Sequence, residues 1–103
     1  MGEIHVDIGL LTLIPLASTP GLQAVDKSTG CWVDLERDVR ENDLLVFPSD
    51  AFRVLTGGYL GGTVHRVLRH PSKERYSIPF ILRPRSDARI ATLPRAGTAF
   101  ESD

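Results

Sequence analysis

Short runs of β-forming residues recur along this chain and constrain its fold more than any other feature. Most of the breaks between the runs contain Pro, Gly, Asn, Asp or Ser, the residues that favour turns. Runs of this length and spacing predict an all-β fold, either a sandwich or a barrel. The predicted strands cover residues 8–15, 21–26, 31–36, 43–48, 63–69 and 75–83.

One segment, "DAFRVLTGG" at residues 50–58, has helical character instead. Phe52 and Leu55 are three residues apart, as on one face of a helix, and the pair Gly57-Gly58 provides a suitable C-cap. We therefore expect at most one short helix.

The composition favours a single globular domain. The chain has 103 residues, of which 42% are hydrophobic and 24% are charged, and a chain of this size builds one core. Residues 85–103 have no hydrophobic period and are rich in Pro, Arg, Ala and Ser. We expect residues 1–84 to form the folded core and residues 85–103 to form a surface tail, with one docked segment around Ile90–Leu93.

Charge and cysteine content exclude several classes of protein. The net charge of −1 gives no basic surface for nucleic acid. The longest apolar run is too short to span a bilayer and lacks the flanks of a signal peptide. We therefore expect neither nucleic acid nor a membrane as a partner. Cys31 is the only cysteine, which rules out an intramolecular disulfide and fits a reducing compartment such as the cytoplasm.

Two ionisable residues, His5 and Asp7, interrupt the apolar run "IHVDIGLLTLIP". In an extended segment, residues i and i+2 point to the same face, so His5 and Asp7 converge while Ile4, Val6 and Ile8 point to the other side. A buried carboxylate without a partner is costly, and a metal ion gives a reason to place one beside a histidine. The alternative is that the two side chains hydrogen-bond each other at a wet strand end.

A second histidine, His65, lies in the β-branched run "TVHRVLRH". Together with His5 and Asp7 it supplies two imidazoles and one carboxylate, the facial triad of non-haem Fe(II) oxygenases. His70 is a competing ligand. Because it precedes Pro71 in a segment of turn composition, we expect His70 to lie in solvent.

A third polar pair, Arg75 and Ser77, lies on one face of the run "RYSIPFIL". A guanidinium fork helped by a hydroxyl donor is suited to hold the carboxylate of a small dicarboxylate inside a barrel. The alternative is an edge strand with one solvated face, which Pro79 favours. The opposite face carries Tyr76, Ile78, Phe80 and Leu82.

Five segments match one family in order. They are "HVDIGLLTLIP", "GLQAVDKSTGCWVDLE", "NDLLVFPSDAFRVLTGG", "TVHRVL" and "RYSIPFILRP". Over residues 4–84 the chain resembles the C-terminal catalytic half of the isopenicillin N synthase-like family of Fe(II)/2-oxoglutarate-dependent dioxygenases. The most specific part of the resemblance is the ordered set His-x-Asp, His and Arg-x-Ser.

The resemblance implies that His5, Asp7 and His65 bind iron and form the catalytic centre. It also implies that Arg75 and Ser77 bind the distal carboxylate of 2-oxoglutarate. The implied fold is a double-stranded β-helix, a jelly roll of the cupin-like type, with residues 1–84 as the C-terminal part of the catalytic core. The expected cofactors are Fe(II) and the cosubstrate 2-oxoglutarate, with ascorbate as a further candidate.

The reaction implied by the resemblance is hydroxylation or desaturation of a small organic substrate by O2, with 2-oxoglutarate converted to succinate and CO2. Two alternatives stay open. Members resembling isopenicillin N synthase or aminocyclopropane carboxylate oxidase keep these motifs without consuming 2-oxoglutarate, and Arg75 and Ser77 then hold a different anion. A jelly-roll fragment that retains the motif is alternatively a catalytically inert metal-binding module.

The chain departs from the family pattern in two turns and in extent. It has "FPSD" at residues 47–50 where the family has "NVGD", and "LTGG" at residues 55–58 where the family has "LTNG". The family's helical half and a strand with further 2-oxoglutarate contacts would precede residue 1. A jelly roll has eight strands, so we expect an incomplete barrel. We expect the chain either to associate through its open sheet edge, as a homodimer or otherwise, or to be marginally stable, with weak activity or none.

Overall fold

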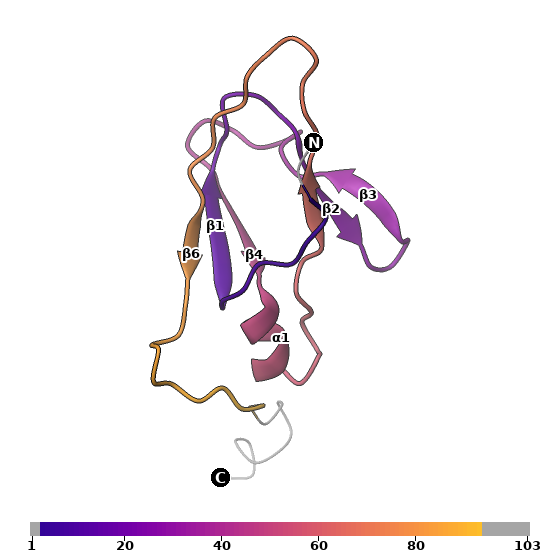
Figure 1. The fold of residues 1–103 in the computed structure, drawn as a ribbon. Helices are drawn as coiled ribbons and strands as arrows, with labels where there is room; N and C mark the ends of the chain where they lie inside the picture. Colours follow the sequence, from indigo (N-terminus) through magenta and orange to yellow (C-terminus); the bar gives the residue numbers. More distant parts are fainter. Residues whose placement is uncertain (1–2, 94–103) are drawn as a thin grey trace.

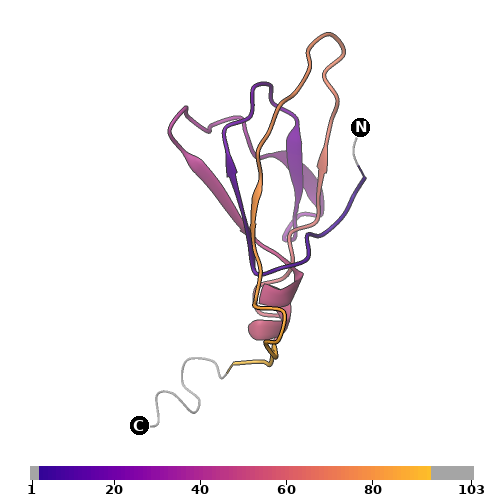
Figure 2. The ribbon, with the colours of Figure 1, turned by 60° about the vertical axis from the view of Figure 1, so that its left-hand side comes forward.

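Two small antiparallel sheets lie face to face, with one short helix at their common end (Figures 1 and 2). This computed structural model describes residues 3–93. The first sheet has the strand order β4-β1-β6 and the second has the order β3-β2-β5. The elements are β1 (Leu11–Pro15), β2 (Leu22–Asp26), β3 (Cys31–Asp34), β4 (Leu44–Pro48), α1 (Asp50–Leu55), β5 (His65–Val67) and β6 (Phe80–Leu82).

Each predicted β run contains one of these strands, and over residues 3–93 the all-β prediction with one short helix is confirmed. All six strands are shorter than the predicted runs that contain them. The first strand begins at Leu11, because Gly9 adopts a φ of 129° that turns the chain before β1. The last strand is limited to Phe80–Leu82 because Pro79, directly before it, has no N–H to donate to the sheet.

The core lies between the two sheets and is small. Ile14 from β1, Leu22 from β2 and Phe47 from β4 are its buried members. The strand β1 alternates between half-buried and buried residues, so its inner side carries Thr12 as well as Ile14. Partly buried hydrophobic residues surround this cluster, namely Leu35, Leu45 and Val67.

The outer side of the β4-β1-β6 sheet is apolar and exposed. Leu44 and Val46 on β4 are 50% and 53% exposed, and Phe80 and Leu82 on β6 are 58% and 52% exposed. The apolar face of the predicted strand 75–83 therefore points outward, and the polar face that carries Arg75 points inward. Within residues 3–93, β4 and β6 are the unpaired edges of this sheet.

The helix ends as predicted. Gly57 and Gly58 have φ values of 66° and 85°, and Gly58 N donates to Arg53 O at 2.8 Å. Leu93 N donates to Leu55 O at 2.8 Å, so a segment of the tail docks against α1, as expected near Ile90–Leu93. Residues 94–103 of the predicted tail lie outside the described residues.

No helix found within residues 3–93 is both long enough and apolar enough to cross a membrane.

Candidate metal centre

His5 and His65 are held side by side by two backbone hydrogen bonds. His5 N donates to His65 O at 3.0 Å, and His65 N donates to His5 O at 2.9 Å. This isolated bridge places His5 against β5, in the second sheet, rather than at the start of the strand that contains Leu11. The two imidazole rings are 4.2 Å apart between centroids.

Asp7 reaches the same point from the segment that joins the two sheets. This segment runs from the β5 side of the molecule to the start of β1 near α1 (Figure 2), and Asp7 O accepts a hydrogen bond from Asp50 N at 2.9 Å. Asp7 Oδ1 lies 3.1 Å from His5 Nε2 and 3.3 Å from His65 Nε2. The convergence of His5 and Asp7 predicted from their spacing is therefore present, although neither belongs to a regular strand.

The three ligand atoms have a spacing that fits one ion. They all lie within 4.8 Å of one another. Two ligands, each ~2.1 Å from a common ion and at a right angle to each other, lie about 3 Å apart. The separations of Asp7 Oδ1 from both Nε2 atoms match this value.

Both histidines also have the carbonyl partner at Nδ1 that metal-binding histidines commonly use. His5 Nδ1 lies 2.9 Å from Glu3 O, and His65 Nδ1 lies 2.8 Å from Thr63 O. Because a carbonyl oxygen only accepts, each Nδ1 must carry the proton of its hydrogen bond. In the neutral form of each ring the lone pair then lies on Nε2, on the side of Asp7, which is the arrangement that metal binding requires.

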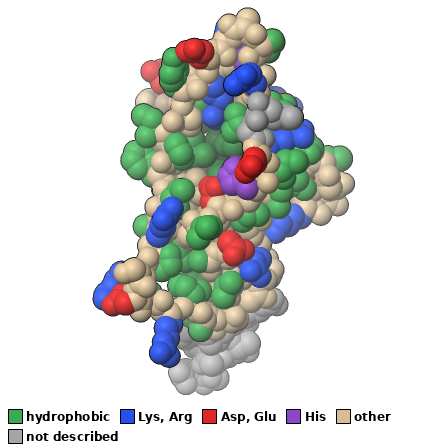
Figure 3. All heavy atoms as spheres, in the orientation of Figure 1, with side chains coloured by type: hydrophobic (Ala, Val, Ile, Leu, Met, Phe, Trp, Pro, Cys, Tyr) green, Lys and Arg blue, Asp and Glu red, His purple; other side chains and the backbone are tan. Residues whose placement is uncertain are grey.

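The site is closed on one side and open on the other. The His65 side chain is 6% exposed, and its ring packs at 5.0 Å from the Phe47 ring. The His5 side chain is 48% exposed. In the view of Figure 3, histidine side chains lie at the molecular surface beside acidic side chains. Further ligands could therefore approach an ion from the His5 side while Phe47 shields the other side.

Thr12 and Ser49 fix the second oxygen of the Asp7 carboxylate. Thr12 Oγ1 donates to Asp7 Oδ2 at 2.7 Å, so Ser49 Oγ, 3.0 Å away, must donate to Thr12. Both residues are buried, with 1% and 0% exposure. Ser49 is the N-cap of α1 but forms no side-chain capping bond. This chain of hydrogen bonds leaves Oδ1 of Asp7 facing the two histidines.

Our sequence predictions did not include Thr12 or Ser49. Each of these residues nevertheless has a sequence feature that could have identified it. Thr12 is a hydroxyl residue inside the apolar run "GLLTLIP", and Ser49 occupies the glycine position of the family's "NVGD" turn.

Replacing Thr12 with Val should lower the affinity for a divalent metal by about 10- to 100-fold, because partners that orient a ligand carry effects of this size. Isothermal titration with Co(II) measures the change. Thr12→Ser keeps the hydroxyl and should retain most of the affinity. If Thr12→Val and Thr12→Ser bind Co(II) equally well, the hydroxyl does not position Asp7.

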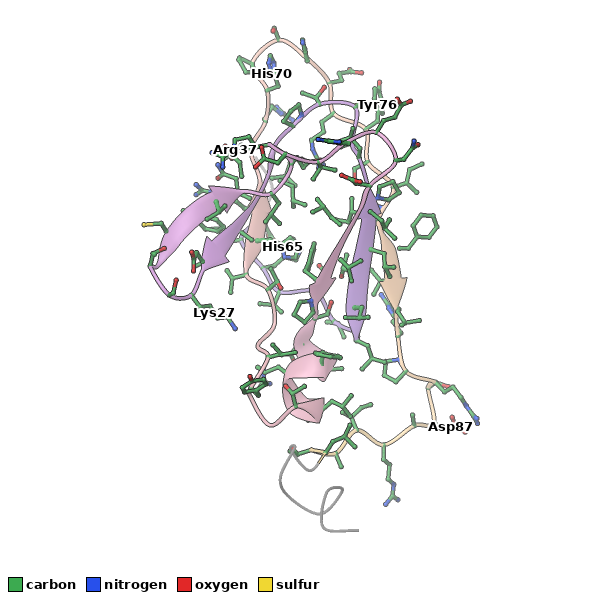
Figure 4. All side chains as sticks on the ribbon, turned by 180° about the vertical axis from the view of Figure 1, so that it is seen from behind. Lys27, Arg37, His65, His70, Tyr76 and Asp87 are labelled. Carbon is green, nitrogen blue, oxygen red and sulfur yellow. The ribbon has the colours of Figure 1, made fainter. Side chains whose placement is uncertain are left out.

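His70 does not join the three residues. It lies near the tip of the long β5–β6 loop, away from His65 (Figure 4). Its Nδ1 accepts hydrogen bonds from Ser72 N and Lys73 N, both at 3.1 Å, so this ring organises the turn. The expectation that His70 is no ligand agrees with this geometry, although the residue is partly buried rather than fully in solvent.

Arg75 and Ser77 point inward from the segment before β6. Both are half-buried, whereas Tyr76 between them is 68% exposed and donates its hydroxyl to Glu74, which raises the pKa of Tyr76. Arg75 Nη2 donates to Glu36 Oε1 at 3.1 Å. Among residues 3–93, the Ser77 hydroxyl has no hydrogen-bond partner.

A cleft of about 870 Å³ lies between the arms of the β5–β6 loop and is lined by residues 67–76. It includes Arg75 but none of the three converging residues. The cleft follows from the arch of this loop, which extends beyond both sheets (Figure 1). The ligand geometry of His5, Asp7 and His65, rather than this cleft, therefore defines the candidate site.

Comparisons with known proteins all lead to the same family of oxygenases. The sequence model of the 2OG-Fe(II) oxygenase superfamily matches residues 1–84. Gibberellin 3-beta-dioxygenase 1 from Oryza sativa subsp. japonica is 32% identical over 94 residues, which are 91% of this chain and 24% of the relative. A 2-oxoglutarate-Fe(II) type oxidoreductase from Aspergillus fumigatus is 36% identical over 76 residues, which are 74% of this chain and 22% of the relative.

A solved structure matches the fold as well. A full-length protein from Neurospora crassa, solved in complex with alpha-KG, superposes with a TM-score of 0.77 at 30% identity, covering 90% of this chain and 29% of that chain. This match confirms the predicted fold class, the double-stranded β-helix. The chain spans about a quarter of the length of the curated relatives it matches.

Proposed function

Because this chain belongs to the 2OG-Fe(II) oxygenase superfamily, we propose that it is the catalytic core of a non-haem Fe(II)- and 2-oxoglutarate-dependent dioxygenase. The observation that carries the proposal is the convergence of Asp7 Oδ1 with His5 Nε2 and His65 Nε2. The proposed reaction hydroxylates or desaturates a small organic substrate, and 2-oxoglutarate and O2 are converted to succinate and CO2.

His5, Asp7 and His65 are the proposed iron ligands. The donor set fits this metal, since two neutral imidazoles and one carboxylate with open positions suit Fe(II) better than a closed structural zinc site. When bound, the ion supplies the redox chemistry that couples 2-oxoglutarate decarboxylation to substrate oxidation. The protein's part is to orient the three ligands through Glu3 O, Thr63 O and Thr12 Oγ1.

Arg75 and Ser77 are the proposed site for the distal carboxylate of 2-oxoglutarate. The guanidinium and the hydroxyl are both donors, they point to the same side, and Ser77 has no other hydrogen-bond partner among residues 3–93. A carboxylate between them would accept from both.

We further place the chain in the isopenicillin N synthase-like branch, on the motifs given above, and in the cytoplasm. The cytoplasmic location is supported by the single free cysteine, Cys31, which a reducing compartment keeps as a thiol. The proposed partners are the small organic substrate and O2, without nucleic acid or membrane, and ascorbate is a further candidate cofactor.

The direct test is to supply Fe(II), O2 and 2-oxoglutarate labelled with ¹⁴C at C1, and to measure release of labelled CO2 together with succinate. Release of both in a metal-dependent manner supports the proposal. A second candidate function is that of an iron oxidase that does not consume 2-oxoglutarate, which the pairing of Arg75 with Glu36 favours. That function would give metal and anion binding without CO2. An inert metal-binding module would bind metal without any turnover.

We also propose that the chain associates with a second copy through the edges of the β4-β1-β6 sheet. The support is the exposed apolar surface of β4 and β6 together with their unpaired edges. A second copy would cover Val46 and Phe80 and add a strand to an edge that is unpaired among residues 3–93.

Sedimentation velocity over a range of protein concentrations should therefore show reversible association. Phe80→Lys should shift the equilibrium toward the monomer, because a charge on an edge strand opposes pairing. Val33→Lys, on β3 of the other sheet, is the matched control and should leave the association unchanged. A monomer at all concentrations would contradict the proposal.

A further inference from the structure

Glu36 is a buried carboxylate directly beside Arg75, and our sequence predictions did not include it. Its side chain is 1% exposed, and that of Arg75 is 14% exposed. Oε1 of Glu36 accepts three hydrogen bonds, from Gly21 N at 3.0 Å, from Leu22 N at 2.8 Å and from Arg75 Nη2 at 3.1 Å. Glu36 thus joins the chain after β3 to the start of β2 and to the segment before β6.

Two buried atoms of this pair lack a partner within residues 3–93. They are Oε2 of Glu36 and Nε of Arg75. Because Nε is itself enclosed by protein, a second carboxylate would have to bond the part of the guanidinium that lines the cleft, which it could do while Arg75 keeps its bond to Glu36. The carboxylate of Glu36 keeps an uncompensated oxygen that repels any such second anion.

The net charge of the Glu36–Arg75 pair determines how strongly a ligand carboxylate binds at Arg75. Glu36 already offsets the positive charge of Arg75 in surroundings from which water is largely excluded, where charges interact strongly. A carboxylate that arrives at Arg75 therefore meets a pair of near-zero net charge instead of a free cation. Its binding is weaker than it would be beside Arg75 alone.

We propose that Glu36 is a specificity-determining residue of the carboxylate site at Arg75. It lowers the affinity for 2-oxo acids that carry a distal carboxylate, and leaves unchanged the affinity for 2-oxo acids that end in a methyl group. The inference rests on the proposed function, in which Arg75 receives the distal carboxylate of 2-oxoglutarate.

The test uses the Mn(II)-loaded chain under anaerobic conditions, with ligand binding measured by isothermal titration calorimetry. Glu36→Gln keeps the size and an acceptor oxygen but removes the charge, so it should bind 2-oxoglutarate roughly tenfold more tightly than wild type. The affinity for 2-oxobutyrate, which lacks the distal carboxylate, should change by less than about twofold. Weaker or unchanged 2-oxoglutarate binding in Glu36→Gln would overturn the proposal, and so would equal gains for both ligands.

Two controls separate this inference from its premise. Asp34→Asn removes an exposed charge two residues earlier, at the end of β3, and should leave both affinities unchanged. Arg75→Gln removes the cation itself. If Arg75→Gln binds 2-oxoglutarate as wild type does, the proposed cosubstrate site is wrong. If Arg75→Gln weakens binding and Glu36→Gln does not strengthen it, only the role of Glu36 is wrong.

A measurement on the unmodified chain covers the case in which Glu36→Gln does not fold. With glutamate labelled by ¹³C at the carboxyl carbon and Zn(II) as a diamagnetic metal, the Glu36 resonance should shift when 2-oxoglutarate is added. It should not shift with 2-oxobutyrate. A Glu36 resonance that is unaffected by 2-oxoglutarate would contradict the proposal, because an anion at Arg75 must change the electric field at its paired carboxylate.

Discussion

Replacing Asp7 with Ala should lower the affinity of the chain for a divalent metal by more than about 100-fold, since even the partners that orient a ligand account for 10- to 100-fold effects. Asp7 Oδ1 faces both histidine Nε2 atoms, so its loss removes the anionic ligand of the set. Thr12 and Ser49 would then have no carboxylate to orient. Titration calorimetry with Co(II) measures the effect without depending on turnover.

His70→Ala is the matched control for this experiment. His70 is the third histidine of the chain, but its ring organises the β5–β6 loop and lies apart from the metal centre. Its replacement should change the metal affinity by less than about twofold, as is usual for substitutions away from a site. Equal losses in Asp7→Ala and His70→Ala would show that the ligand assignment is wrong.

Replacing Arg75 with Lys should weaken 2-oxoglutarate binding by roughly tenfold or more, because an ammonium group keeps the charge but loses the planar fork that holds a carboxylate by two bonds. In the structure one arm of that fork is already bonded to Glu36. A lysine at this position would pair with Glu36 as a point charge and leave no directed donor for the ligand. Titration of 2-oxoglutarate into the Mn(II)-loaded variant measures the loss.

Arg69→Lys serves as the control, because Arg69 is an exposed arginine of the same loop. It should bind 2-oxoglutarate as the unmodified chain does. An unchanged affinity in Arg75→Lys would remove the basis for the carboxylate site and, with it, the basis for the role of Glu36.

The periodicity of the sequence was sufficient to predict the strands. Alternation and turn residues act locally, within a few residues, and the strand β2 and the helix α1 lie where these signals placed them. The spacing His5-x-Asp7 was also enough to predict that these two side chains converge. Residues i and i+2 of an extended segment point to the same face, whether or not the segment belongs to a sheet. No local pattern links His65 to the other two, so it was assigned from the ligand chemistry of a facial triad and from the family resemblance.

Only the tertiary structure decided how the segments are paired and which side of each strand faces the core, because these features depend on contacts between residues far apart in the chain. The bridge between His5 and His65 joins two segments that share no periodicity, and it places His5 on the second sheet. The side that each strand presents to the core was also undetermined. The apolar side of the segment before β6 points outward, because Arg75 finds its partner Glu36 inside.

The sequence by itself therefore determined which elements form and which residue types are available for a metal site. It did not determine how Thr12, Ser49 and Glu36 are used. Each is a polar residue whose meaning depends on a partner distant in sequence, since a buried hydroxyl or carboxylate is stable only where such a partner meets it. Asp7 and Arg75 are those partners, and only the packing of the two sheets brings them within hydrogen-bonding distance.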